Sequence, residues 1–177
     1  MGLDFTVYKK RKDKTCEETW EEINNHRRDY LEDHLGDFES PLELAYGRKS
    51  WELVDVLVPG FQTYEKMEGW VDPPVEKESW DRLMKMIEPI GDKLDDIIDA
   101  FDREEYMPED YSDFVFTDEH KKLIAEYEYW YNKTFDTGPT LGYSFSAYYM
   151  RTFWKANDKV QEVYKDPEFE VRASVSY

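Results

Sequence analysis

The last nine residues, 169–177, read Phe-Glu-Val-Arg-Ala-Ser-Val-Ser-Tyr. Apolar residues or alanine alternate with charged or polar residues along this stretch, which is the period of a half-buried β-strand. Residues 3–9, Leu-Asp-Phe-Thr-Val-Tyr-Lys, begin a similar alternation at the other end of the chain. A lone strand leaves its backbone groups unpaired, so we expect the two terminal strands to pair in one small sheet.

The chain between these strands shows the three-to-four-residue apolar spacing of amphipathic helices. Ser40-Pro41 provides an N-cap and a first-turn proline for one of them, and Pro89 with Gly91 is expected to kink or split another. We predict an α+β fold, a mostly helical single domain over residues 1–177 with a small sheet. The expected helices span residues 15–34, 41–57, 76–103, 117 to about 136, and 144–165.

Net charge is the unusual bulk property, because 41 acidic residues against 23 basic ones give −18. Such a field repels nucleic acid and anionic membranes, and it favours solubility or a basic partner. The single cysteine, Cys16, cannot form an internal disulfide and fits a reducing compartment. No apolar run approaches the roughly 20 residues of a membrane span, and the N-terminus lacks the apolar stretch of a signal peptide. We therefore expect a cytoplasmic protein.

The densest acidic segment is 92–119, which holds twelve acidic residues against Lys93 and Arg103. On a helix, several of its aspartates recur at spacings of three and four and form one carboxylate ridge. Such a ridge could imitate the phosphates of a nucleic acid and occupy a basic protein surface. A solvated helix face is the alternative. The proposed partner-binding residues are Asp92, Asp95, Asp96, Asp99, Asp102, Glu104, Glu105, Glu109, Asp110 and Asp113.

Aromatic residues are concentrated toward the C-terminus, and those at helical spacing are expected in the core. In the last helix these include Tyr148, Tyr149 and Phe153. Tyrosine is also common at protein interfaces because it is amphipathic. Residues Tyr106 and Phe114, together with Tyr111, could therefore anchor a partner that the carboxylates steer.

A second candidate site combines basic and aromatic residues in the second expected helix. Tyr46, Arg48, Lys49 and Trp51 are the residue types that hold a nucleotide through charge and ring contacts. Such cations more often pair with surrounding acidic residues, and that alternative remains open.

Catalytic and metal-binding motifs are not found. The sequence has no Gly-x-Ser-x-Gly, no phosphate-binding glycine loop, no His-Glu-x-x-His and no calcium loop. Cys16 adjoins Glu17 and Glu18, which disfavour a reactive thiolate. We therefore expect no enzymatic activity, no metal and no cofactor.

Two short stretches carry a family resemblance: Met1–Tyr8, and Glu-Leu-Ala-Tyr-Gly-Arg-Lys at 43–49. Together they resemble small bacteriophage and prophage proteins that open with Met-Gly-Leu-Asp-Met-Tyr-Leu-Tyr and carry Glu-Leu-Ala-Tyr-Trp-Arg-Lys. The chain departs from that pattern at Phe5, Thr6 and Gly47. The family has no assigned activity, so the resemblance implies an accessory viral protein in a bacterial cytoplasm and no catalytic residue.

Three functional hypotheses follow. The leading one is a non-enzymatic, phage-encoded acidic protein that occupies a basic surface of a host nucleic-acid-handling or defence protein as a nucleic-acid mimic and inhibitor. The second is a protein that sequesters a nucleotide through the residues around Arg48. The third is a phage structural or assembly component. None of them requires direct contact with nucleic acid or membrane.

Overall fold

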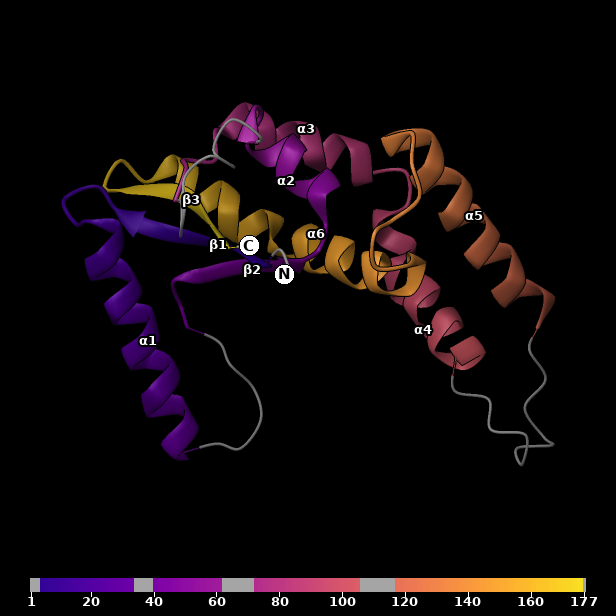
Figure 1. Ribbon diagram of the computed structural model, residues 1–177, viewed down its shortest axis with the longest axis horizontal. Coiled ribbons are helices and arrows are strands. Elements are labelled where there is room, and N and C mark those ends of the chain that lie inside the picture. Colours follow the sequence, from indigo (N-terminus) through magenta and orange to yellow (C-terminus); the bar gives the residue numbers. More distant parts are fainter. Residues whose placement is uncertain (1–3, 34–39, 62–71, 106–116, 177) are drawn as a thin grey trace.

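The terminal strands pair as the sequence predicts, in an α+β fold that consists mainly of helices (Figure 1). The structure is a computed structural model that describes residues 4–33, 40–61, 72–105 and 117–176. Its elements in chain order are β1 (Asp4–Arg11), α1 (Cys16–Asp33), β2 (Glu43–Arg48), α2 (Trp51–Leu57), α3 (Lys77–Ile87), the short 3₁₀ helix η2 (Gly91–Lys93), α4 (Leu94–Glu105), α5 (Asp118–Phe135), α6 (Tyr143–Lys165) and β3 (Phe169–Ser176).

The sheet is antiparallel with strand order β2-β1-β3. β1 and β3 pair over their whole length, from Asp4 opposite Ser176 to Arg11 opposite Phe169. A short extended segment then covers the outer edge of β3: the Val75 amide donates to the Val171 carbonyl at 2.9 Å, and the Ala173 amide donates to the Pro73 carbonyl at 3.0 Å. In this sheet the first and last strands of the chain are therefore neighbours.

The predicted helix over residues 41–57 is wrong, because its first half is strand β2 and only α2 is helical. Residues 43–45 are good helix formers, but pairing with β1 overrides that weak local preference. Gly47 makes the pairing close, since a Cβ there would lie 2.3 Å from the ring of its cross-strand partner Phe5. Phe5 and Gly47 therefore face each other across β1 and β2.

The other helix boundaries follow the sequence signals. α3 ends at Ile87, and η2 and α4 begin after the turn that contains Pro89, which confirms the predicted break. Gly91 packs tightly here, because a Cβ on it would lie 2.3 Å from the indole of Trp154. Thr117 caps α5 as expected, with its side chain accepting a hydrogen bond from the His120 amide.

Helix α6 organises the core, since it packs against β2, β3, α3, α4 and α5. Its Phe153 ring lies 5.5 Å from the ring of Phe5 and 5.9 Å from that of Trp80, measured between centroids. The indole N–H of Trp80 donates to Asn157 Oδ1 at 3.0 Å, so the buried tryptophan keeps a polar partner. Helix α6 therefore packs against both the sheet and the other helices.

Candidate functional site

The aspartates of the predicted ridge lie on the solvent side of α4 and of the turn before it. Asp92, Asp95, Asp96, Asp99 and Asp102 are all exposed. The opposite face of α4 is apolar and packs against α5 and α6. The apolar stripe of the sequence therefore orients the carboxylates outward, as helical periodicity requires.

Basic residues compensate part of this ridge. Asp95 accepts from Lys155 at 2.9 Å and from Arg151 at 3.3 Å, and both cations come from α6. The hydrogen bond from Lys155 is the main cause that lowers the pKa of Asp95. Asp99 pairs with Arg103 one turn later, at 2.8 Å. Two of the five aspartates are thus neutralised within the molecule.

The remaining three aspartates are exposed. Asp92 lies in η2, Asp96 in the first turn of α4 and Asp102 near the end of α4, and none of the three has an ion pair within the described part of the chain. The side chains of Glu104 and Glu105, at the end of α4, are outside the described residues. The other predicted contacts also lie outside that part: Tyr106, Glu109, Asp110, Tyr111, Asp113 and Phe114.

A groove of about 370 Å³ opens beside Asp102, between α4 and α6. Two of its aromatic side chains reach solvent, since Phe145 is 52% exposed and Tyr148 is 47% exposed. The expectation that Tyr148 lies in the core is therefore wrong, because it occupies the edge of α6 that α4 leaves open. We call this the α4–α6 groove, and its lining is Ile98, Phe101, Asp102, Ser144, Phe145, Tyr148, Tyr149 and Arg151.

An aromatic ladder joins this groove to the sheet. The Tyr148 ring lies 5.7 Å from the Tyr149 ring, which lies 6.1 Å from the ring of Tyr46 on β2. Tyr46 donates its hydroxyl hydrogen bond to Asp4 at 2.9 Å, and Arg48 also pairs with Asp4, at 3.2 Å. Burial, helped by Asp4, raises the pKa of Tyr46 to about 12, so the phenol stays neutral and donates at physiological pH.

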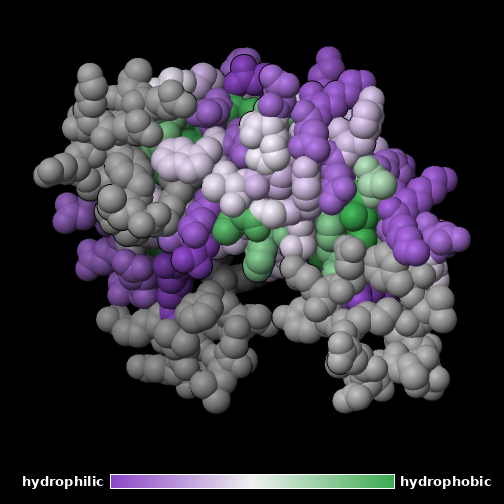
Figure 2. All heavy atoms as spheres, turned by 45° about the vertical axis from the view of Figure 1, so that its right-hand side comes forward, coloured by the Kyte–Doolittle hydropathy of each residue, from purple (hydrophilic) through white to green (hydrophobic). Residues whose placement is uncertain are grey.

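The chemistry of the α4–α6 groove favours a cationic side chain. Aromatic faces attract guanidinium and ammonium groups, and a carboxylate beside them adds a charged hydrogen bond. The structure already contains one such contact, because the Arg151 guanidinium lies 5.0 Å from the Tyr148 ring centroid. Figure 2 turns the α4–α5 side forward and shows hydrophobic atoms at the surface in small areas among hydrophilic residues.

The second predicted site is not brought together as one pocket. Tyr46 and Arg48 are exposed on the same side of β2 and both contact Asp4. Trp51 instead packs at the start of α2, with its ring 6.3 Å from that of Phe61. Lys49 adopts a positive φ of 47° in the turn between β2 and α2. Arg48 is thus already paired with a carboxylate.

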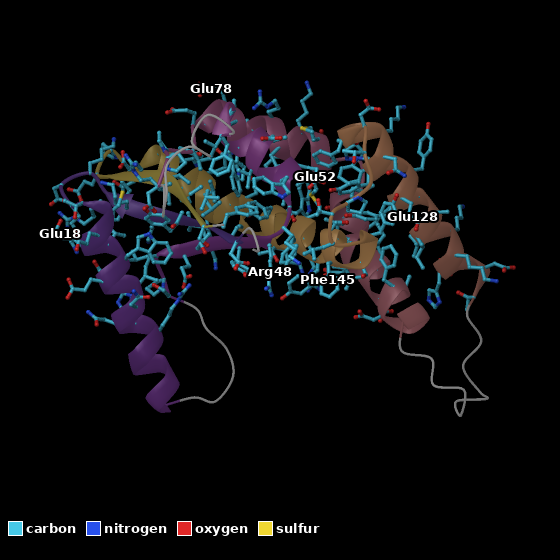
Figure 3. All side chains as sticks on the ribbon, in the orientation of Figure 1. Glu18, Arg48, Glu52, Glu78, Glu128 and Phe145 are labelled. Carbon is cyan, nitrogen blue, oxygen red and sulfur yellow. The ribbon has the colours of Figure 1, made fainter. Side chains whose placement is uncertain are left out.

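One carboxyl oxygen that sequence reasoning missed is buried, and its half-buried residue has no ion pair among the described residues. Glu52, in the first turn of α2, accepts hydrogen bonds from Tyr131 and Thr140, while its Oε2 has no hydrogen-bond partner in that part of the chain. Burial raises the pKa of Glu52 above its ordinary value. In Figure 3 Glu52 lies well above Arg48 and Phe145, so it does not belong to the α4–α6 groove.

Sequence reasoning also missed Phe145 and Arg151 as surface residues of a site. Helical spacing placed aromatics of 144–165 in the core, and nothing local distinguishes Phe145 from Phe153. The sequence feature that could have indicated this surface was the concentration of tyrosines near the C-terminus, because tyrosine is common at protein interfaces. The partners of that surface come from α4, which lies about 50 residues earlier in the chain.

No helix within residues 4–33, 40–61, 72–105 and 117–176 combines the length and apolarity needed to cross a bilayer. Over the same ranges, no group of three or more histidine, cysteine or acidic side chains is arranged to hold a metal ion. Comparison with protein-family models, with curated proteins and with solved structures found no match to this chain.

Proposed function

We propose that this chain is a non-enzymatic, phage-encoded protein that binds a basic surface of a host protein in the bacterial cytoplasm. The observation that carries the proposal is the α4–α6 groove, where exposed Phe145 and Tyr148 stand beside Asp102. The partner class follows from the charge: a nucleic-acid-handling or defence protein offers lysines and arginines arranged to meet phosphates.

Charge supports the approach of such a partner. The chain carries −18, and the carboxylates of Asp92, Asp96 and Asp102 are exposed with no ion pair among the described residues. Fields of this kind raise association rates with basic proteins and weaken as salt increases. Because Asp95 and Asp99 are paired internally, we assign the steering role to Asp92, Asp96 and Asp102.

The exposed aromatic residues of the α4–α6 groove would supply most of the binding energy for the proposed partner. Binding energy at interfaces concentrates in a few aromatic and arginine residues, and carboxylates at the rim mainly affect rate and specificity. Phe145 is more than half exposed although it is fully apolar, and it is bordered by Tyr148 and Asp102. In the α4–α6 groove, the guanidinium of a partner arginine would stack on the Phe145 ring and donate a hydrogen bond to the Asp102 carboxylate.

The first experiment captures partners from bacterial lysate at low and high salt and identifies them by mass spectrometry. We expect one basic, nucleic-acid-binding protein that high salt releases and that nucleic acid displaces. The proposal fails if the only proteins retained are acidic or insensitive to salt.

The second experiment measures the affinity of that purified partner for variants by calorimetry. Phe145→Ser should weaken binding by about 30-fold, the effect of losing a central hot spot. Tyr129→Ser is the matched control, since Tyr129 is 68% exposed but lies on α5 outside the groove. Equal losses in the two variants would contradict the assignment of the α4–α6 groove.

A further inference from the structure

Arg151 of α6 contacts an aromatic ring and a carboxylate at the same time. Its guanidinium lies 5.0 Å from the Tyr148 ring centroid, and its Nη1 lies 3.3 Å from Asp95 Oδ1 on α4. Lys155 pairs with the same carboxylate at 2.9 Å, yet its side chain is 60% exposed, against 28% for Arg151. At this carboxylate the arginine therefore packs against the protein, while the lysine stays mostly in solvent.

The same combination of contacts recurs on α1. The Arg27 guanidinium lies 5.8 Å from the Trp20 ring centroid and pairs with Glu43 of β2. Lys9 and Lys133 also lie on aromatic rings, at 5.4 and 5.8 Å from the centroids, but neither lysine has an ion pair among the described residues. A planar guanidinium can stack on a ring while it donates hydrogen bonds to a carboxylate, whereas an ammonium is compact and strongly hydrated. A site that joins a ring to a carboxylate therefore suits arginine.

The α4–α6 groove lies one heptad away from the Arg151 contact. Asp95, near the start of α4, pairs with Arg151, whereas Asp102, near its end, lines the groove together with Ser144. The two helices therefore run in opposite directions along this contact. Seven residues are nearly two helical turns and return a side chain to the same face, about 10 Å along the axis. Asp102 is seven residues after Asp95, and Ser144 is seven residues before Arg151.

The groove lacks the arginine that this repeat would supply. Its carboxylate, Asp102, is exposed and has no ion pair in the part of the chain that the structure describes, and position 144 carries a serine. The rings of Phe145 and Tyr148 line the same groove and reach solvent. Arg151 lines it too, but that cation is already paired with a carboxylate of α4. The groove thus offers rings and a carboxylate without the cation that completes the neighbouring contact.

We propose that the α4–α6 groove selects arginine over lysine, and that Ser144 is the specificity-determining residue that keeps it open for an arginine of another protein. The incoming guanidinium repeats the Arg151 contact, with Asp102 as its carboxylate and Phe145 as its ring. The charge of −18 attracts lysine and arginine alike from a distance, so the selectivity arises on contact. This inference rests on the proposed function, because it names the side chain that the partner inserts and the residue that admits it.

The test uses two capped pentapeptides of glycine, one with a central arginine and the other with a central lysine, so that their charges are equal. NMR titration of the full chain measures both affinities and locates the peptides through the ring signals of Phe145 and Tyr148. We expect the arginine peptide to shift these signals and to bind about fivefold tighter than the lysine peptide, because it alone can stack and bond to the carboxylate together. Equal affinities, shifts centred elsewhere, or binding of neither peptide would overturn the inference.

Variants at position 144 sharpen the result. Ser144→Arg supplies the arginine from within the molecule and should weaken binding of the arginine peptide by about tenfold, whereas Ser144→Lys adds the same charge and should weaken it by only about twofold. Circular dichroism checks that both variants fold. If either does not, Phe145→Ser should remove the preference for arginine and its control Tyr129→Ser should keep it. Equal losses from the two substitutions at position 144 would overturn the selectivity.

This result is separable from that of the proposed function. Selective binding of the arginine peptide, with no basic partner captured from lysate, would keep the arginine site and remove the proposed class of host protein. A basic partner held through Phe145, with equal affinities for the two peptides, would keep the proposed function and overturn the selectivity.

Discussion

Two faces of α6 are built from similar residues but differ in exposure. On the buried face, Phe153 packs against Phe5 of the sheet and Trp80 of α3, and Val160 and Val163 are also buried. On the face beside the α4–α6 groove, Phe145 and Tyr148 remain exposed. Cores exclude water around every apolar group, whereas an exposed aromatic beside carboxylates marks a surface suited to a partner. We therefore expect substitutions on the buried face to affect stability, and we propose that the exposed face contacts a partner.

The largest expected effect separates the two faces directly. Phe153→Ala should lower the free energy of unfolding by about 4 kcal/mol, because it removes a fully buried ring and leaves a cavity. Phe145→Ala should change it by less than about 0.5 kcal/mol, since half of that ring is already in water. Urea unfolding followed by circular dichroism measures both. Similar losses in the two variants would break the distinction.

A smaller loss tests how closely β1 and β2 pack at the Phe5–Gly47 pair. Gly47→Ala should destabilise the fold by about 2 kcal/mol, because the added methyl group meets the Phe5 ring. Gly138→Ala is the control, since its Cβ would meet nothing closer than 3.8 Å. In a double-mutant cycle, Phe5→Leu should recover part of the loss. No coupling between positions 5 and 47 would contradict the contact.

A gain in stability is expected on the helical side, at Glu52. Its pKa is raised in the folded state, so protonation favours folding, and stability is lost as the pH rises through that folded pKa. Glu52→Gln keeps hydrogen-bonding groups without the charge and should therefore stabilise the fold at neutral pH. Thermal unfolding between pH 4 and 8 should show the gain disappear toward acid, as about 4.3 is the ordinary glutamate value. A constant gain at all pH values would contradict it.

The smallest effect concerns the internal pairs of α4. Asp95→Asn should cost about 0.5 kcal/mol, as expected for an exposed pair screened by solvent. Because the pKa of Asp95 is lowered in the folded state, this stability is present above the unfolded pKa and lost as the pH falls through the folded one. Asp96→Asn is the matched control. Its unfolding free energy should not fall, since no ion pair within the described residues is removed.

Much of the fold could be predicted from the sequence. Alternation at both ends predicted the paired terminal strands, and Pro89 with Gly91 predicted the division between α3 and α4. Strand β2 could not be predicted in this way, because residues 43–45 favour a helix locally. Its partner strand, β1, lies about 40 residues earlier in the chain, as in the pair of Phe5 with Gly47, and the two become adjacent only when the sheet forms.

The candidate site divides in the same way. Helical spacing by itself determined that Asp92, Asp95, Asp96, Asp99 and Asp102 face away from an apolar stripe, because that depends only on the 3.6-residue period. Which aspartates remain available was decided by the tertiary structure, which brings Arg151 and Lys155 from α6 to Asp95. Ion pairing and exposure depend on distances between elements, and a linear pattern does not contain those distances.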